Sequence, residues 1–382
     1  MILILNENAD LKSAEYAALM QRLQALPAIE IRVHRIEGEL RAVTEVYLLG
    51  DTKPLSVEEM QALPCVERVV RVSEEYRILG RHTGDTRPSH FEYQGLRFGQ
   101  DSLNIFAGLC AVDTPEHVEQ MCRALSDNGQ VCTRMGAYKP RTSPYSFQGH
   151  GRSCLNYVFD IAGKHGIKVI AMEVTHESHV HEIRDALRET GSPTGVMLQI
   201  GTRNTQNFEL LKAVGRQQDF PVLLKRGFGI TLDESLNAAE YLASEGNGRV
   251  VFGLRGMKTN MGDPFRNFVD FAHVPVVKRL TRMPVCVDPS HSVGARTRAA
   301  DGILDLMHVT AQAIVSGANM VLVDFHPDPP TALVDGPQAL LLSELPHFLE
   351  DAAIARDAYL RRMQAALRQA GAEPLGSAKA TA

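Results

Sequence analysis

Seven cationic side chains recur along the central part of the sequence, each at or close behind a short apolar segment. They are Arg134, Lys139, Arg141, Arg203, Lys225, Arg226 and Arg255. So many like charges facing one cavity would repel one another unless anions were bound there, and arginine side chains match phosphate and carboxylate groups with paired hydrogen bonds. The set predicts a binding site for at least two anionic groups.

A second set combines thiol, imidazole and carboxylate side chains over the same part of the chain. It consists of Cys110, His291, Asp324 and Asp335. Such a mixture suits a divalent transition metal ion that keeps an open position and acts as a Lewis acid. A metal beside a polyanion site indicates activation of a carbonyl group next to a phosphorylated substrate.

Regular structure must bring these side chains together, and from residue 103 the chain alternates short apolar segments with loops and amphipathic segments. We interpret the apolar segments as strands at residues 103–110, 130–138, 168–174, 196–201, 221–227, 249–256, 284–291 and 319–327. Eight such units predict an α/β fold, the (β/α)8 or TIM barrel, whose active site lies at the C-terminal strand ends. Most members of the two sets fall at or just behind those ends, together with Glu173 and His326: Cys110, Arg134, Lys139, Arg203, Lys225, Arg226, Arg255, His291 and Asp324. An open doubly wound sheet is the alternative, but the chain lacks a GxGxxG turn.

Residues 1–76 carry a different pattern, strand, helix, strand, strand, helix, strand, which is typical of a ferredoxin-like domain. Strands are predicted at residues 1–6, 29–36, 43–49 and 66–72, and helices at residues 11–26 and 56–63. We interpret residues 77–102 as a linker and a hairpin that caps the barrel. The barrel is assigned to residues 103–356, and a final helix with a disordered tail after Gly371 to residues 357–382.

The composition excludes several classes of protein. Lysine and arginine number 40 against 45 aspartates and glutamates, a net charge of −5, so no general cationic field would hold nucleic acid or an anionic membrane. The apolar runs are shorter than a membrane span needs, and the start does not resemble a signal peptide. The six cysteines are dispersed without CxxC pairs, which predicts reduced thiols and a cytoplasmic protein.

Five separated motifs together resemble one enzyme family. "KPRTSPYSFQG", "LQIGTRN", "LLKRG", "VDPSH" and "FHPDP" are similar in order and spacing to 3-deoxy-D-arabino-heptulosonate 7-phosphate (DAHP) synthase of the short Iβ kind, whose members can carry an N-terminal ferredoxin-like regulatory domain. The resemblance implies the first step of the shikimate pathway, in which phosphoenolpyruvate condenses with erythrose 4-phosphate. It also implies a homo-oligomer and feedback by an aromatic amino acid.

The resemblance further implies roles for individual residues. Erythrose 4-phosphate would be held by the KPRTS motif, and phosphoenolpyruvate by a second group of cations. The erythrose 4-phosphate residues are Lys139, Arg141, Thr142 and Ser143, the phosphoenolpyruvate residues are Arg134, Arg203, Lys225 and Arg255, and the ligands for Mn²⁺, Co²⁺, Fe²⁺ or Zn²⁺ are Cys110, His291, Asp324 and Asp335. Lys139 lies among other cations, which predicts a lowered pKa and a role as proton donor.

Three stretches depart from the family pattern, at positions that include Leu109, Ala111, Asp324 and Leu254. "AGLCA" stands where AGPCS is usual, Asp324 where glutamate is usual, and Leu254 falls in "GLRG" where CERG is usual. Two alternatives therefore stay open. One is a 3-deoxy-octulosonate 8-phosphate synthase, although KPRTS favours the four-carbon sugar; the other is a catalytically impaired barrel that serves as a sensor or binds a partner.

Overall fold

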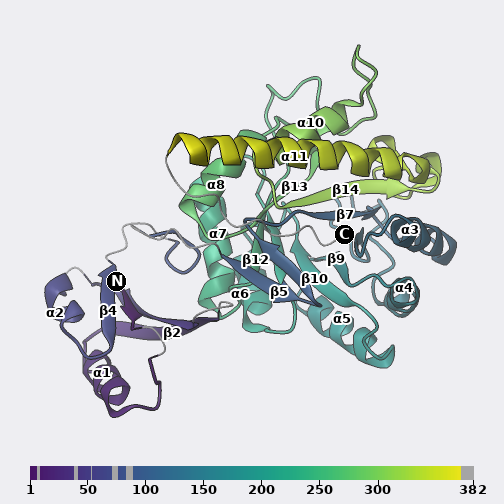
Figure 1. Ribbon diagram of the computed structural model, residues 1–382. Coiled ribbons are helices and arrows are strands. Elements are labelled where there is room, and N and C mark those ends of the chain that lie inside the picture. Colours follow the sequence, from purple (N-terminus) through teal and green to yellow (C-terminus); the bar gives the residue numbers. More distant parts are fainter. Residues whose placement is uncertain (7–8, 38–41, 53, 71–75, 83–88, 371–382) are drawn as a thin grey trace. The chain divides into compact units, whose positions relative to one another are not determined.

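The computed structural model describes residues 1–6, 9–37, 42–52, 54–70, 76–82 and 89–370 (Figure 1). The chain divides into two compact units, Met1–Thr86 and Arg87–Ala382. The disorder predicted after Gly371 and part of the predicted linker, residues 83–88, lie outside the described residues.

The first unit is a four-stranded antiparallel sheet with two helices. Its elements are β1 (Ile2–Leu5), α1 (Ala14–Gln24), β2 (Ile29–Glu37), β3 (Ala42–Gly50), α2 (Val57–Gln61) and β4 (Val66–Val70). The strand order β2-β3-β1-β4 confirms the predicted ferredoxin-like fold. Both helices begin where a serine accepts a backbone hydrogen bond, Ser13 from the amide of Tyr16 and Ser56 from that of Glu59.

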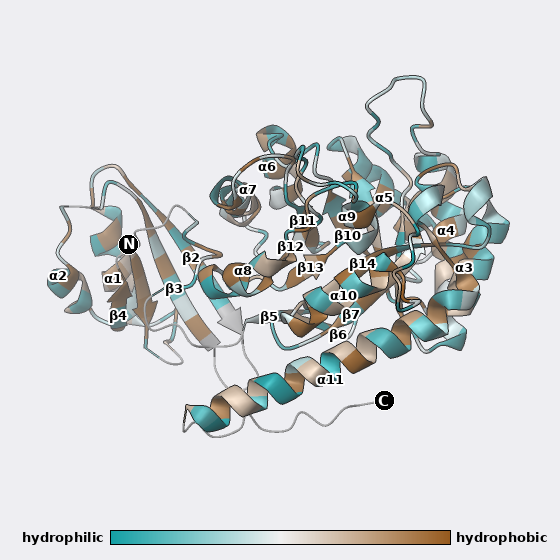
Figure 2. Ribbon diagram, turned by 90° about the horizontal axis from the view of Figure 1, so that it is seen from above, coloured by the Kyte–Doolittle hydropathy of each residue, from teal (hydrophilic) through white to brown (hydrophobic). Residues whose placement is uncertain are grey.

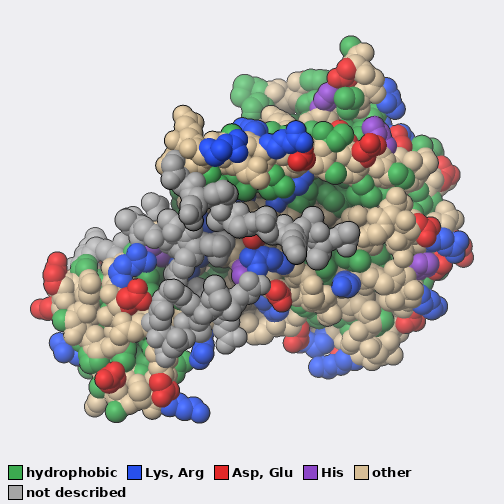
Figure 3. Space-filling model, in the orientation of Figure 1, with side chains coloured by type: hydrophobic (Ala, Val, Ile, Leu, Met, Phe, Trp, Pro, Cys, Tyr) green, Lys and Arg blue, Asp and Glu red, His purple; other side chains and the backbone are tan. Residues whose placement is uncertain are grey.

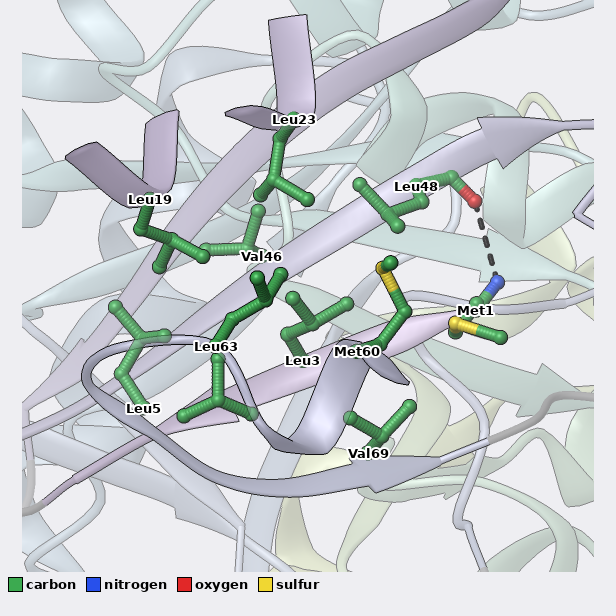
Figure 4. Packing of buried hydrophobic residues seen from close by; sticks show 11 residues of the cluster. Met1, Leu3, Leu5, Leu19, Leu23, Val46, Leu48, Met60, Leu63 and Val69 are labelled. Atoms are coloured by element: carbon green, nitrogen blue, oxygen red, sulfur yellow. Dashed lines mark hydrogen bonds between the residues drawn. The ribbon is translucent and has the colours of Figure 1, made fainter. Parts of the chain in front are cut away.

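The hydrophobic core of this unit forms because side chains repeat on one face every two residues along a strand and every three to four residues along a helix. Leu3 and Leu5 point to the same face of β1 because successive strand residues alternate, and Leu19 and Leu23 share one face of α1 because they are four residues apart. Figure 4 shows these four leucines converging with Met60 of α2. The unit therefore has a hydrophobic core of its own.

The second unit is a closed parallel barrel, as predicted. Its strands are β7 (Asn104–Leu109), β8 (Cys132–Met135), β9 (Val169–Val174), β10 (Gly195–Ile200), β11 (Val222–Lys225), β12 (Val250–Leu254), β13 (Val285–Val287) and β14 (Met320–His326). Each pairs with the next, β14 pairs with β7, and the short β15 (Leu340–Leu341) adds to β14. The strands are coloured mainly hydrophobic in Figure 2, because a parallel sheet covered by helices is buried on both faces.

Helices follow the strands and surround the barrel (Figure 1). They are α3 (Pro115–Asp127), α4 (Arg152–Lys164), α5 (Ser178–Glu189), α6 (Phe208–Arg216), α7 (Leu232–Ser244), α8 (Val274–Leu280), α9 (Pro289–Val293), α10 (Asp305–Val315) and α11 (Leu345–Gln369). No helix within the described ranges is both long and apolar enough to cross a bilayer. On the face shown in Figure 3, acidic and basic side chains are interspersed.

A hairpin of β5 (His90–Tyr93) and β6 (Leu96–Gly99) packs against the N-terminal ends of the barrel strands. Phe98 is 1% exposed among the inward-facing side chains there, and the hydroxyl of Tyr93 accepts a hydrogen bond from the amide of Val196. This end of the barrel is filled by side chains, so a binding site must lie at the opposite end.

Among the differences between the observed and the predicted element boundaries, two have a clear cause. β13 ends at Val287 and His291 lies on α9, because Pro289 has no amide proton to continue the ladder but suits the first turn of a helix. α11 runs through residue 356, where the barrel was expected to end. The amphipathic pattern of α11 begins before residue 357, where the sequence interpretation placed the start of the final helix.

Candidate active site

A cavity of about 310 Å³ opens at the C-terminal ends of the barrel strands. Its lining residues are Arg134, Lys139, Pro140, Arg141, Thr142, Ser143, Ser146, Glu173, Gln199, Gly201, Thr202, Arg203, Lys225, Arg255, Arg266, His291 and Asp335. The cavity thus collects all eight side chains predicted to bind the two substrates. Cys110 and Asp324 lie beside it and are almost fully buried, at 5% and 0% exposure.

Some of the cavity's cations are held by buried carboxylates. Lys225 Nζ lies 2.6 Å from Asp288 Oδ2, and Arg134 Nη1 lies 2.5 Å from Asp324 Oδ1. Removing one partner of such a pair leaves an uncompensated buried charge. These contacts fix the two cations at the base of the cavity.

Three other cations have no acidic partner among the described residues: Arg141, Arg203 and Arg255. Phe228 lies between two of them, with its ring centroid 5.5 Å from the guanidinium carbon of Arg203 and 4.8 Å from that of Arg255. Arg255 is 3% exposed, burial lowers its pKa to about 10, and its Nη1 has no hydrogen-bond partner within the described part of the chain. An anion in the cavity would satisfy these groups.

The segment from Lys139 to Gln148 forms a loop closed at its base by backbone hydrogen bonds. The amide of Lys139 donates to the carbonyl of Gln148 at 2.9 Å, and the amide of Gly151 donates to the carbonyl of Ala137 at 2.8 Å. Arg203 Nη2 donates to the Thr142 hydroxyl at 3.3 Å. The hydroxyl-rich loop therefore contacts Arg203, one of the three cations without an acidic partner among the described residues.

Lys139 is buried at the centre of the site, with 8% exposure. Its Nζ donates to the carbonyl of Cys110 at 2.8 Å and to the Cys110 sulfur at 3.5 Å, and it lies 3.6 Å from the Glu173 carboxylate. Gly136 permits this approach, since a Cβ there would lie 2.3 Å from the Cys110 carbonyl oxygen.

The predicted lowering of the Lys139 pKa is wrong. Burial lowers this pKa, but the Cys110 sulfur and the Glu173 carboxylate outweigh burial and raise it above the ordinary value for lysine. These two acidic groups lie closer to Nζ than the sequence could show. Lys139 is accordingly a charged donor at neutral pH.

The four predicted metal ligands come together from the end of β7, helix α9, strand β14 and the loop that follows β14. Donor atoms of Cys110, His291 and Asp324 all lie within 4.8 Å of one another. Asp335 completes the group, because its Oδ2 lies 3.2 Å from Cys110 Sγ and 3.4 Å from His291 Nε2. Asp335 has φ 57°, a left-handed conformation that aspartate tolerates better than most residues.

These donors fit a divalent transition metal ion. Thiol sulfur, imidazole nitrogen and two carboxylates are the mixed set that such ions accept. His291 Nδ1 lies 3.0 Å from Asp288 Oδ1, so the ring can donate there and leave Nε2 free as a ligand. Asp324 Oδ1 is buried and, despite its ion pair with Arg134, accepts no hydrogen bond from the described residues.

Outer contacts hold the two carboxylates. Gln338 Nε2 donates to Asp324 Oδ2 at 2.5 Å, while its Oε1 accepts from Arg266 Nη1 at 3.0 Å. Arg266 Nη1 also lies 3.0 Å from Asp335 Oδ1. One arginine therefore links both carboxylates, directly to Asp335 and through Gln338 to Asp324.

Two residues expected at the cavity rim lie elsewhere. Arg226 is 3% exposed, and its Nη1 lies 3.1 Å from Asp270 Oδ2 and 3.0 Å from His273 Nδ1. It follows Lys225 directly, and successive residues of an extended chain point to opposite sides. His326 lies outside the cavity lining and bonds to Asp113 instead.

Several residues with contacts in the site were not predicted. Asp288 belongs to the "VDPSH" motif, so its proximity to His291 gave a usable signal. Arg266, Phe228 and Gln338 lie in loops beyond the strand ends, where no periodicity marks them. Gly201 also matters, because a Cβ there would lie 1.8 Å from the Glu173 carboxylate.

Comparison with known families matches both units of the chain. The model of the DAHP synthetase I family matches residues 70–357, and that of the DAHP synthase ferredoxin-like domain matches residues 1–74. The phospho-2-dehydro-3-deoxyheptonate aldolase of Thermotoga maritima is 36% identical over 312 residues, which cover 81% of this chain and 86% of that one. A 2-dehydro-3-deoxyphosphooctonate aldolase of Rhodopseudomonas palustris is 27% identical over 265 residues, 65% of this chain and 86% of that one.

Solved structures of DAHP synthases are also similar to this chain. A crystal structure of phospho-2-dehydro-3-deoxyheptonate aldolase (DAHP synthase) from Thermotoga maritima has a TM-score of 0.67 and 30% identity, covering 94% of this chain and 97% of that one. A truncated form of 3-deoxy-D-arabino-heptulosonate 7-phosphate synthase from the same organism has a TM-score of 0.61 and 28% identity, covering 78% of this chain and 99% of that one.

Proposed function

Because the chain belongs to the DAHP synthetase I family, we infer that it catalyses the DAHP synthase reaction. Phosphoenolpyruvate, erythrose 4-phosphate and water become DAHP and phosphate, the first step of the shikimate pathway. The observation that carries this inference is a cavity lined by three arginines that have no acidic partner among the described residues and by His291 and Asp335, which converge with Cys110 and Asp324 beside the cavity. A polyanion site beside a Lewis-acid site is what this condensation needs.

The two substrates divide the cavity between them. Arg134, Lys225, Arg203 and Arg255 hold the phosphate and carboxylate of phosphoenolpyruvate, and Arg141, Thr142 and Ser143 hold the phosphate of erythrose 4-phosphate. The hydrogen bond from Arg203 to Thr142 supports a boundary between the two subsites at that point. Lys139 lies between the base of the cavity and the hydroxyl-rich loop.

A divalent ion held by Cys110, His291, Asp324 and Asp335 would supply Lewis-acid polarisation of the sugar aldehyde. The arginines orient C3 of phosphoenolpyruvate toward the aldehyde carbon, where the new carbon–carbon bond forms. Lys139, charged and buried, donates a proton to the oxygen of that carbon. Its other close acidic neighbour, Glu173, lines the cavity and can take a proton from the water that adds at C2. Phosphate then leaves by cleavage of the C2–O bond.

A direct assay separates this function from the two alternatives. Phosphate release from phosphoenolpyruvate is measured with erythrose 4-phosphate or arabinose 5-phosphate as the acceptor. Release with the four-carbon sugar alone is expected. Preference for the five-carbon sugar would indicate an octulosonate synthase, and no release with either would indicate an impaired barrel.

Replacing Arg141 tests the erythrose 4-phosphate subsite. Arg141→Ala removes a charged hydrogen-bond donor worth about 1.5–3 kcal/mol, so KM for erythrose 4-phosphate should rise roughly ten- to a hundredfold. KM for phosphoenolpyruvate should change far less. Arg123→Ala, which removes a surface arginine paired with Glu119 on α3, is the matched control. Equal increases for both substrates would contradict the assignment.

We propose that the ferredoxin-like unit senses an aromatic amino acid, the end product of the pathway. It has its own core, and every described residue that lines the cavity belongs to the barrel unit. An effector can act only by binding one conformational state better than another.

Truncation separates regulation from chemistry. A chain beginning at residue 87 is expected to fold, because the barrel has its own core cluster and a truncated relative has a solved structure. It should keep synthase activity and lose inhibition by tyrosine or phenylalanine, measured by phosphate release. If none of the three aromatic amino acids inhibits the full chain, the proposal that the ferredoxin-like unit is a sensor is contradicted. If the truncated barrel folds but is inactive, the proposal that the barrel alone carries out the reaction is contradicted.

The remaining expectations are assembly and location. We propose that the protein forms a homo-oligomer, as its resemblance to the family implies. We also propose that the enzyme is located in the cytoplasm. All six cysteines are unpaired, and a cysteine ligand such as Cys110 needs a reducing environment to stay available.

A further inference from the structure

Beyond the substrate cavity, a second cluster of titratable groups joins β7, α3 and β14, which lie side by side (Figure 1). His326 Nε2 lies 2.6 Å and His117 Nδ1 2.9 Å from the same oxygen, Asp113 Oδ2. Asp113 and His326 are 9% and 3% exposed. The cluster contains no residue assigned to the substrates or the metal, so it needs its own explanation.

The three donor atoms lie within 4.8 Å of one another, which by itself could accommodate a metal ion. The tautomer of His326 argues otherwise. The amide of Asp328 donates to His326 Nδ1 at 3.0 Å, so Nδ1 is an acceptor and the ring proton is on Nε2, facing Asp113. A metal at Nε2 would leave the ring without any proton, whereas histidine ligands normally donate from their other nitrogen. The cluster is therefore a hydrogen-bonded junction.

Asp113 accepts from several directions and is ionised. Its Oδ1 accepts from the amide of Thr114 at 2.8 Å, and its Oδ2 accepts from both histidines. Burial raises the pKa of Asp113, but the hydrogen bonds from His326 and His117 outweigh burial and lower it to about 2. Both carboxylate oxygens of Asp113 thus accept hydrogen bonds from neighbouring groups of the protein, which hold the side chain in place.

The position of this junction relates it to the metal site. The ladder between β7 and β14 ends at the pair Gly108 and Asp324. Cys110 lies two residues beyond Gly108, and Asp113 and His326 form the next side-chain hydrogen bond between the two segments. The backbone carbonyl of Asp113 also accepts from His150 Nε2 at 2.9 Å, at the end of the hydroxyl-rich loop.

We propose that Asp113, through His326, is a positioning residue that sets the separation of Cys110 and Asp324 and so the affinity of the site for its metal ion. This inference rests on the proposed assignment of Cys110 and Asp324 as ligands. Neither Asp113 nor His326 touches the ion or a substrate. Their effect is to hold two backbone segments together where the strand ladder no longer does.

The test measures Mn²⁺ binding by the full chain in a chelator-buffered titration without substrates. Loss of a group that hydrogen-bonds directly to a metal ligand weakens affinity by about 10- to 100-fold; Asp113 and His326 act one contact further out, so a loss of about tenfold, the lower limit of that range, is expected for Asp113→Asn and His326→Leu. His326→Gln should restore most of the affinity, because its amide nitrogen can donate at the place of Nε2. His165→Leu is the matched control, since His165 makes a similar contact with Glu119 at 2.8 Å between α3 and α4.

Stoichiometry, thermal unfolding and a ligand variant decide between the outcomes. The inference is supported if the full chain binds one Mn²⁺ and His326→Leu binds it more weakly. The thermal unfolding midpoint of His326→Leu must also be no lower than that of His165→Leu. Two ions per chain, with one lost in His117→Ala, would make the cluster a metal site and overturn it. Unchanged affinity in folded His326→Leu, with loss in Cys110→Ala, also overturns it. If Cys110→Ala binds normally as well, the ligand assignment itself is wrong.

Discussion

Exhaustive removal of divalent metal is expected to lower kcat by roughly a thousandfold or more, since Lewis-acid stabilisation is worth several kcal/mol. The structural reason is the convergence of Cys110, His291 and Asp324 with the carboxylate of Asp335. Mn²⁺, Co²⁺ or Fe²⁺ added back should restore turnover, measured as phosphate release. Full activity after chelation, with metal content checked by elemental analysis, would contradict the metal site.

Variants of the ligands make this prediction specific to the site. Cys110→Ala should abolish metal-dependent activity, because it removes the sulfur donor. Asp324→Glu should still bind metal, because it keeps the carboxylate and matches the residue usual in the family, whereas Asp324→Asn should not. The ligand assignment fails if the glutamate variant is inactive and the asparagine variant is active.

Lys139→Met is expected to lower kcat by about 10²- to 10⁴-fold, the contribution typical of a positioned general acid. The side chain is buried, charged and within 3.6 Å of Glu173, and methionine fills a similar volume without a proton to donate. KM for phosphoenolpyruvate should change less than kcat, because the arginines of that subsite remain in place.

Two controls keep the Lys139 result interpretable. Lys164→Met removes an exposed lysine of α4 and should leave kcat unchanged. Metal content and the thermal unfolding midpoint of Lys139→Met show whether the loss reflects chemistry or a disturbed site, because Lys139 also bonds to the Cys110 carbonyl. A folded, metal-loaded Lys139→Met with normal kcat would exclude Lys139 as the proton donor.

The departures from the family pattern do not disrupt the site. Leu109 and Leu254 are fully buried at the ends of β7 and β12, so they fill the barrel wall. Asp324, shorter than glutamate, is still brought within reach of Cys110 and His291. The reading as an impaired barrel therefore has little support from geometry.

Local sequence patterns were enough to predict the architecture and to name most of the side chains that meet at one end of the barrel. The eight barrel strands and the βαββαβ unit were predictable because alternation and helical periodicity are local properties of neighbouring residues. The convergence of the predicted ligands and cations was predictable as well, because parallel strands deliver their C-terminal ends to one face. Knowing the strands was enough to place most of these side chains at one rim, although Arg226 and His326 lie elsewhere.

The partner that each charged side chain contacts became known only from the folded arrangement of the chain. Arg226 is paired with Asp270, 44 residues away, the pKa of Lys139 is raised by Cys110 and Glu173, and His326 is committed to Asp113. Each outcome depends on distances of a few ångströms between segments far apart in sequence, since electrostatic and hydrogen-bond energies change steeply over that range. Residue types and spacing along one chain carry no such distances, so the electrostatics of the site could be known only after the barrel had closed.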